Sequence, residues 1–452
     1  MNLSSFIIIL FFLKIQSLRE TLKIVNTSNP YFSSEDNSNI IFVFNHMKHG
    51  ANSPCYGLND YYADIFEQQW KGFCELTKKG FLQLFKLGKI FQQRYDKLLN
   101  IKSKNPDVNK IISYASKENK TLMSSNAFFY GMYYNNDTPV EEQIVVPTRN
   151  FKIIPDKELI PIFYFGDINN CMGWKNLVDK IDENKIEPLN DFFSKFIKSY
   201  EDIFNLLNSR DKMRYSKSWF EKINLFCSSY ISNYYDERYK NIDIFQQLKY
   251  TEEQFYDLYY DCNLFNLYKY TLIQYNGEAK DVPQVILSDL LNDMFRYMDF
   301  AINNINNENP KFLSYMGHDS TIAAMQVILQ RLYNVKTKIM NFGSNQIFLL
   351  IKNGNTYEIK YFYNDELLLN INYDEFKNRI LDLMKKNEKD LVYFCQGFQK
   401  KDYTIIILFS TIIALFIANV SVCLYHRTTL CERKKYISIE PTGKSIEIRN
   451  EV

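Results

Sequence analysis

Short apolar runs alternate with longer stretches of helical periodicity in the first third of the chain. Asn39–Asn45 is apolar, β-branched and aromatic, which is typical of a buried strand. Glu75–Leu99 places apolar side chains near helical spacing, so it predicts an amphipathic helix that packs on a sheet. Lys110–Ala115 predicts a second strand, and residues 116–133 predict a loop entering a helix. This order predicts an α/β fold, with a central sheet and helices on both faces.

The pattern changes between residues 150 and 265, where apolar positions recur at helical spacing. We interpret 150–265 as a mostly α-helical cap that is inserted into a core formed by 19–149 and 266–402. No repeat or low-complexity linker separates the two parts, so we expect core and cap to form one structural unit.

Signals for β structure return after the cap. Lys311–Met316 predicts a buried strand, and Gln346–Lys360 predicts a hairpin. Its Asn353-Gly354 pair suits a tight primed turn.

The two ends of the chain predict its cellular compartment. Residues 1–18 contain an apolar run too short to span a bilayer, which is typical of a secretory signal peptide. Tyr403–Tyr425 has no charged residue and about the 20 residues that a transmembrane helix needs, although a long core helix is the alternative. A basic cluster begins the tail, 426–452, as expected on the cytosolic side. The pattern predicts a single-pass type I membrane protein whose bulk is lumenal or extracellular.

Composition narrows the classes of partner. The net charge of +2 gives no reason to expect a nucleic acid partner. No cysteine stands in a Cys-x-x-Cys pair, so we expect no metal site. Six cysteines in an oxidising compartment predict up to three disulfides in any of fifteen pairings; they are Cys55, Cys74, Cys171, Cys227, Cys262 and Cys395. Three sequons suit the surface of a glycoprotein: Asn26, Asn119 and Asn136.

Three of the four histidines lie at the ends of predicted strands. His46 and His49 end the first strand, and His318 follows Lys311–Met316 in the same way. Gly50 breaks the first strand, so His49 is expected in a loop at a carboxyl edge of the sheet, where α/β proteins place ligands. Position alone does not establish catalysis, because a histidine at a strand end is more often structural.

The residues around these histidines resemble the histidine acid phosphatases, which carry an Arg-His-Gly-x-Arg-x-Pro motif and a distal His-Asp. Residues 48–54 (KHGANSP) are similar to the first motif, and His318-Asp319 matches the second. Leu76–Gly80, Gln83 and Leu87-Gly88 resemble the stretch between them. The similarity runs from about residue 40 to about residue 370 and is weakest in the cap.

The resemblance implies a role for each site residue and no cofactor. His49 would attack phosphorus and form a phosphohistidine, since a neutral imidazole is a competent nucleophile. Asp319 would protonate the leaving alcohol, provided that an acidic lumen keeps it protonated. His318 would bind the phosphoryl oxygens. His46 is a rival nucleophile, but it lies within the strand end and lacks the following glycine.

The chain departs from the family at the three arginines that hold phosphate. Lys48, Asn52 and Lys120 stand in their places. Lysine keeps the charge without the planar fork, and asparagine keeps only a neutral donor. Each lost contact costs about 2 to 4 kcal/mol of transition-state stabilisation, by analogy with oxyanion donors. A glycan on Asn119 would also crowd the site.

Two hypotheses from different classes therefore stay open. The first is a membrane-anchored acid phosphatase that hydrolyses phosphomonoesters with reduced activity. The second is an inactive relative that binds a phosphorylated ligand or serves as a receptor ectodomain. Tyr436 and Ile439 in the tail resemble an adaptor-binding sorting signal, which favours a lysosomal or endosomal address with transit through the cell surface. The physiological substrate and the oligomeric state are not predicted.

Overall fold

The computed structural model describes residues 39–55, 70, 72–101, 107–134, 148–150, 187–209, 219–275, 283, 287–304, 310–384 and 400–435. The predicted signal peptide, Cys171, Cys395, Asn26, Asn136 and the sorting signal at Tyr436 and Ile439 lie outside these residues. The chain divides into two compact units, Met1–Gln396 and Gly397–Val452. The predicted cap and the predicted core as far as Gln396 fall in the first unit.

The first unit is built on a seven-stranded sheet with the order β3-β2-β4-β1-β5-β6-β7. The first four of these strands are parallel, and the last three add antiparallel to one another beyond β1. The strands are β1 (Ile40–Lys48), β2 (Ile111–Ala115), β3 (Thr148–Asn150), β4 (Phe312–Gly317), β5 (Asn345–Asn353), β6 (Thr356–Tyr363) and β7 (Glu366–Asn372).

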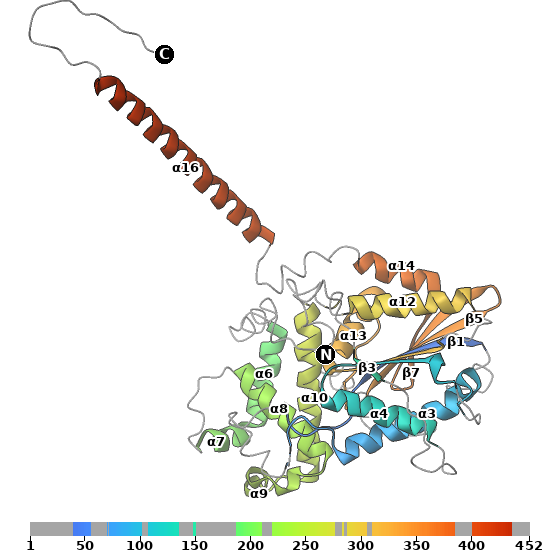
Figure 1. Cartoon of the computed structure of the whole chain (residues 1–452). Helices are drawn as coiled ribbons and strands as arrows, with labels where there is room; N and C mark the ends of the chain where they lie inside the picture. The colour runs from blue at the N-terminus through green and yellow to red at the C-terminus, as the bar shows by residue number, and fades with distance from the viewer. Residues whose placement is uncertain are drawn as a thin grey trace, which may run out of the picture. The chain divides into compact units, whose positions relative to one another are not determined.

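Helices cover both faces of this sheet (Figure 1). Alternate side chains of β1 point to opposite faces, as the pleat of a strand requires. Val43 and Met47 belong to the buried cluster on the side of α3 and α4, whereas Phe42 and Phe44 belong to the cluster on the side of α12, α13 and α14. The α/β prediction is confirmed. The helices are α3 (Lys78–Leu99), α4 (Asn119–Tyr133), α12 (Ser288–Asn303), α13 (Asp319–Tyr333) and α14 (Tyr373–Met384).

The described residues between β3 and α12 are mainly helical, as the periodicity predicts. They form α6 (Glu187–Ser199), α7 (Glu201–Ser209), α8 (Trp219–Tyr235), α9 (Asp243–Leu248) and α10 (Glu252–Tyr275). The last of these helices continues past residue 265, packs against α8 and reaches α13 in the core. The predicted boundary between cap and core at residue 265 therefore falls inside helix α10.

One difference from the predicted elements matters for the site. The strand predicted to end at Asn45 continues to Lys48, so His46 is a strand residue and His49 follows the strand directly.

The hairpin of β5 and β6 forms as predicted, with Gly354 in the turn at a φ of 61°. Sequence analysis missed β7 and α14, which extend the sheet and cover it.

Two disulfides form among the described cysteines, which confirms the prediction of disulfide bonding. Cys55 pairs with Cys74, and Cys227 pairs with Cys262. The first closes a loop beside the first motif. The second joins α8 to α10 within the cap.

The second unit contains a single described helix, α16 (Lys400–Lys435), which includes the predicted span Tyr403–Tyr425. Its described apolar side chains between Ile407 and Tyr425 are exposed. Within the part of the chain that the structure describes, no helix combines the length and apolar character needed to cross a bilayer. The predicted transmembrane helix is therefore not confirmed.

Candidate active site

The parallel pairing of β1 with β4 brings the two histidine motifs together. In this register Lys48 lies opposite Gly317, so the next residues, His49 and His318, leave adjacent strand ends. The backbone N–H of His49 donates to the Gly317 carbonyl at 3.0 Å. The two imidazole rings meet edge to face, with 5.3 Å between their centroids.

The loop after His49 is held against the first turn of α3. A β-carbon on Gly80 would lie 2.0 Å from the carbonyl oxygen of Ala51, so only glycine permits this close approach. The Thr77 hydroxyl caps the helix by accepting from the Gly80 N–H at 3.0 Å. The backbone N–H of Thr77 in turn donates to Ala51 at 2.9 Å. These contacts give a physical reason for the Leu-Thr-x-x-Gly pattern.

The loop that follows His49 determines which ring nitrogen of this histidine carries the proton. His49 Nδ1 lies 2.9 Å from the carbonyl oxygen of Gly50, which can only accept a hydrogen bond. Nδ1 therefore carries the proton, and Nε2 keeps its lone pair. Burial, then Lys120, His318 and Lys48, lower the pKa of His49 well below its ordinary value. The lowered pKa favours the neutral ring, with an unprotonated Nε2.

Asp319 begins α13, where the helix dipole favours a carboxylate. Lys48 Nζ lies 3.4 Å from Asp319 Oδ2 and also donates to the Met340 carbonyl at 3.0 Å. Burial favours the protonated acid, but Lys48 and Lys269 outweigh it and hold the pKa of Asp319 below its ordinary value. A lowered pKa favours the carboxylate of Asp319, whereas the predicted role as proton donor requires the protonated acid.

His318 is held from the β2–α4 loop. Its Nε2 lies 3.1 Å from Ser116 Oγ and 3.6 Å from Glu118 Oε1. Burial lowers the pKa of His318 to about 4, against the opposing effect of Glu118. His318 is therefore neutral over most of the acidic range, and at 3.6 Å its contact with Glu118 is too long for a hydrogen bond.

Lys120 and Asn52 lie at the Cys55–Cys74 disulfide. Lys120 Nζ contacts both sulfurs, at 3.3 and 3.0 Å, and pairs with Glu118 at 2.6 Å. Its charge acts on His49, as a phosphate ligand requires. The Asn52 amide instead donates to the Ser53 carbonyl at 2.7 Å and to Cys55 at 3.1 Å, which uses both of its hydrogens within its own loop. The exposed Asn119 lies beside the buried Lys120.

His46 has a different environment from His49. Its Nδ1 lies 3.0 Å from Gln346 Oε1, and its Nε2 lies 3.0 Å from Thr321 Oγ1. Burial lowers the pKa of His46 to about 3. Both ring nitrogens are engaged, so His46 joins β1 to β5 and α13 and has no lone pair directed at a substrate.

Sequence analysis missed two charged groups at this site. Glu118 contacts both His318 and Lys120, and Lys269 on α10 acts electrostatically on Asp319 and Lys48. Glu118 lies two residues before Lys120, in the segment 116–133 that is predicted as a loop entering a helix. Lys269 lies past the helical run, and only the packing of α10 on α13 brings it near the motifs.

Two proteins named as acid phosphatases are similar to this chain in sequence. A Caenorhabditis elegans protein named as an acid phosphatase is 25% identical over 303 residues, which cover 66% of this chain and 63% of that protein. Rat lysosomal acid phosphatase is 25% identical over 336 residues, which cover 72% of this chain and 70% of the relative. The chain thus spans less than two thirds of the nematode protein.

Solved structures share the fold at low identity. A phytase from Citrobacter braakii superimposes with a TM-score of 0.54 at 11% identity, over 76% of this chain and 98% of that one. A multiple inositol polyphosphate phosphatase from Bifidobacterium longum gives 0.52 at 11% identity, over 81% and 96%. The model of the histidine phosphatase superfamily, branch 2, matches residues 16–364. This match covers most of the chain and both histidine motifs, and the chain belongs to the histidine phosphatase superfamily, branch 2.

Proposed function

We propose that the protein is an acid phosphatase that hydrolyses phosphomonoesters through a phosphohistidine on His49. The observation that carries the proposal is the state of the His49 ring, which is neutral and holds its proton on Nδ1, so that Nε2 is the nucleophile. The acid phosphatase relatives support this class of substrate.

The reaction proceeds in two transfers. His49 Nε2 attacks phosphorus and forms the P–N bond while the ester P–O bond breaks, and a proton passes through Asp319 to the departing alcohol oxygen. Water then attacks phosphorus while the P–N bond breaks to regenerate His49, and Asp319 takes a proton from that water and passes it to the departing phosphate, so that Asp319 ends the cycle as a carboxylate. Dividing the hydrolysis in this way gives two lower barriers.

The proton for the leaving group arrives with the substrate. Lys48 and Lys269 keep Asp319 as a carboxylate, so Asp319 alone brings no proton. The second pKa of a phosphomonoester is about 6, so the ester is largely a monoanion in an acidic compartment. Its remaining proton is shared with Asp319 and passed to the alcohol oxygen. This order of events makes activity acid-favoured without a raised aspartate pKa.

Two lysines provide the positive charge that the family obtains from arginine. Lys48 and Lys120 are both buried and both act on His49. Charge in a buried site stabilises a developing phosphoryl anion more than it would in water. Lysine lacks the two-pronged geometry of arginine, so we expect slower turnover than an arginine site would give.

The second candidate function is phosphate-ligand binding without turnover. The contacts of Asn52 favour it, because this replacement for arginine directs its donors to Ser53 and Cys55. Binding needs only the cations and the ring donors, whereas hydrolysis also needs His49 and Asp319 placed for transfer. Trapping of the intermediate separates the two functions.

We propose that the catalytic unit is lumenal or extracellular, in a lysosome or endosome or at the cell surface. The Cys55–Cys74 and Cys227–Cys262 disulfides suit an oxidising compartment. One relative is named a lysosomal acid phosphatase.

The deciding experiment mixes the full chain with a 32P-labelled aryl phosphate at pH 5 and quenches it in alkali, which preserves phosphohistidine. Wild type should retain alkali-stable label, and His49→Ala should retain none. Label that persists in His49→Ala, or wild type that never labels while inorganic phosphate accumulates, would refute the mechanism. Binding of orthophosphate without label or turnover would establish the second function.

A further inference from the structure

Glu118 is a charged side chain at the candidate site to which the proposed reaction gives no task. It is the residue before α4 (Asn119–Tyr133), and its side chain makes no hydrogen bond that caps this helix. Its carboxylate contacts the site instead: Oε2 lies 2.6 Å from Nζ of Lys120, and Oε1 lies 3.6 Å from Nε2 of His318. The two carboxylate oxygens therefore lie next to two groups that are expected to hold phosphate.

The ammonium of Lys120 is already engaged with this carboxylate. An ammonium has three hydrogens. In the described part of the chain, Nζ of Lys120 contacts the Cys55 sulfur at 3.3 Å, the Cys74 sulfur at 3.0 Å and the Glu118 carboxylate at 2.6 Å. Sulfur is a weak acceptor, whereas the carboxylate makes a charge-assisted contact. A phosphoryl oxygen can therefore take a strong hydrogen bond from Lys120 only where Glu118 gives up its place.

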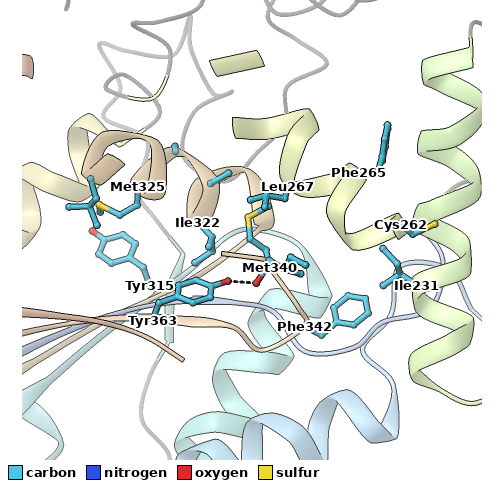
Figure 2. Close-up of a cluster of buried hydrophobic side chains, with 14 of the residues drawn as sticks. Ile231, Cys262, Phe265, Leu267, Tyr315, Ile322, Met325, Met340, Phe342 and Tyr363 are labelled. Atoms are coloured by element: carbon cyan, nitrogen blue, oxygen red, sulfur yellow. Dashed lines mark hydrogen bonds between the residues drawn. The ribbon is translucent and has the colours of Figure 1, made fainter. Parts of the chain in front are cut away.

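Lys48, the other lysine of the phosphoryl site, is fixed by partners that belong to the core. Its Nζ donates to the Met340 carbonyl at 3.0 Å and lies 4.9 Å from the centroid of the Phe342 ring. Met340 and Phe342 belong to the buried apolar cluster shown in Figure 2. Glu118, in contrast, is a long side chain that is 48% exposed. An anionic ligand can thus reach Lys120 by displacing a side chain that has room to move into solvent.

We propose that Glu118 occupies the phosphate position at Lys120 until a ligand binds, and that a phosphoryl group binds by displacing it. This inference rests on the proposed function, which assigns Lys120 to the phosphoryl group. Burial raises the pKa of Glu118, but His318 and Lys120 outweigh it and hold the pKa below its ordinary value, so the side chain is anionic at pH 5. Glu118 therefore competes with phosphate and raises the concentration of phosphate that is needed to fill the site.

The test is a calorimetric titration of the full chain with inorganic orthophosphate at pH 5. Glu118→Gln removes the competing charge, so orthophosphate should bind about three- to fivefold more tightly than it binds wild type. Glu118→Asp keeps the charge but is one carbon shorter, so it releases Lys120 and should also bind orthophosphate more tightly. Glu252→Gln is the matched control, because Glu252 pairs with Lys240 at 2.6 Å in the cap and its replacement should leave the Kd unchanged.

Orthophosphate binding requires no turnover, so the proposed function and this inference can fail separately. Tighter binding in both Glu118 variants without any hydrolysis would end the proposed reaction and support the inference. Weaker or unchanged binding in Glu118→Gln would overturn the inference, because Glu118 would then position Lys120 or play no part. Tighter binding in Glu118→Gln alone would overturn it too, because charge repulsion explains that result without the contact. Failure of both wild type and Glu118→Gln to bind orthophosphate would have the same consequence.

Discussion

Lys48 Nζ lies 3.4 Å from Asp319 Oδ2, and this contact links the residue before the nucleophile to the proposed proton donor. It follows from the register of β1 and β4, which sets Lys48 beside Gly317, two residues before Asp319. The Lys48 side chain is almost fully buried, so its charge acts through little water. One lysine thus acts electrostatically on both His49 and Asp319.

Replacing Lys48 tests this double role. Lys48→Met removes a buried cation from the transition state, so we expect kcat/KM for phenyl phosphate to fall by about 30- to 1000-fold, equivalent to about 2 to 4 kcal/mol. Lys48→Arg keeps the charge and adds a second prong, so it should raise kcat above wild type. Steady-state kinetics at pH 5 gives both values. Near-normal activity in Lys48→Met would show that the phosphate site lies elsewhere.

The pH profile of the wild type should follow the substrate rather than the enzyme. The pKa of His49 is lowered well below its ordinary value, which favours the neutral ring in the acidic range. The pKa of Asp319 is also lowered, so it gives no titration between pH 4 and 7. Activity should be full while the ester is a monoanion and should be lost as the pH rises through the second pKa of the ester, about 6.

Two esters with different second pKa values show whether this loss of activity at higher pH, the alkaline limb of the profile, comes from the substrate or from an enzyme group. The limb of kcat/KM should occur at lower pH for 4-nitrophenyl phosphate than for phenyl phosphate, because the nitro group makes its phosphate more acidic. An identical limb for both esters would assign the titration to an enzyme group and contradict a proton supplied by the substrate.

His46 should matter for stability and not for the chemistry. Its ring is fully buried between Gln346 and Thr321, so His46→Ala leaves a cavity and removes the partner of Gln346 Oε1, while the Thr321 hydroxyl keeps its hydrogen bond to the His318 carbonyl. We expect a loss of about 2 to 4 kcal/mol in the free energy of unfolding. His46→Asn should recover part of it. The folded fraction of His46→Ala should still form labelled phosphohistidine, whereas an unlabelled but folded variant would revive His46 as the nucleophile.

The sequence predicts where this site lies more fully than it predicts which charged groups surround it. Apolar runs followed by His49 and His318 are enough to predict two loop tips at one sheet edge, because strand ends are local features. The contact of Lys48 with Asp319 depends on β4 lying between β1 and β2, which is a property of the sheet order. Lys269 is missed for a similar reason, since only the packing of α10 on α13 relates it to Asp319.

The disulfide beside the first motif should affect both stability and activity. Cys55 and Cys74 join two segments that also pair through their backbones, with Ser53 N–H donating to Glu75 at 2.8 Å, and their sulfurs contact Lys120. Removing both cysteines as Cys55→Ser and Cys74→Ser should cost about 3 kcal/mol of stability, as for a closed loop of this length. Because Lys120 loses its packing, kcat for phenyl phosphate should also fall severalfold in the folded protein. The control is Cys227→Ser with Cys262→Ser, which opens the disulfide between α8 and α10 of the cap and should lower Tm by a comparable amount while kcat per folded molecule is kept. Thermal unfolding and active-site titration give the two quantities, and an unchanged kcat in the first pair would show that Lys120 does not need the disulfide for its position.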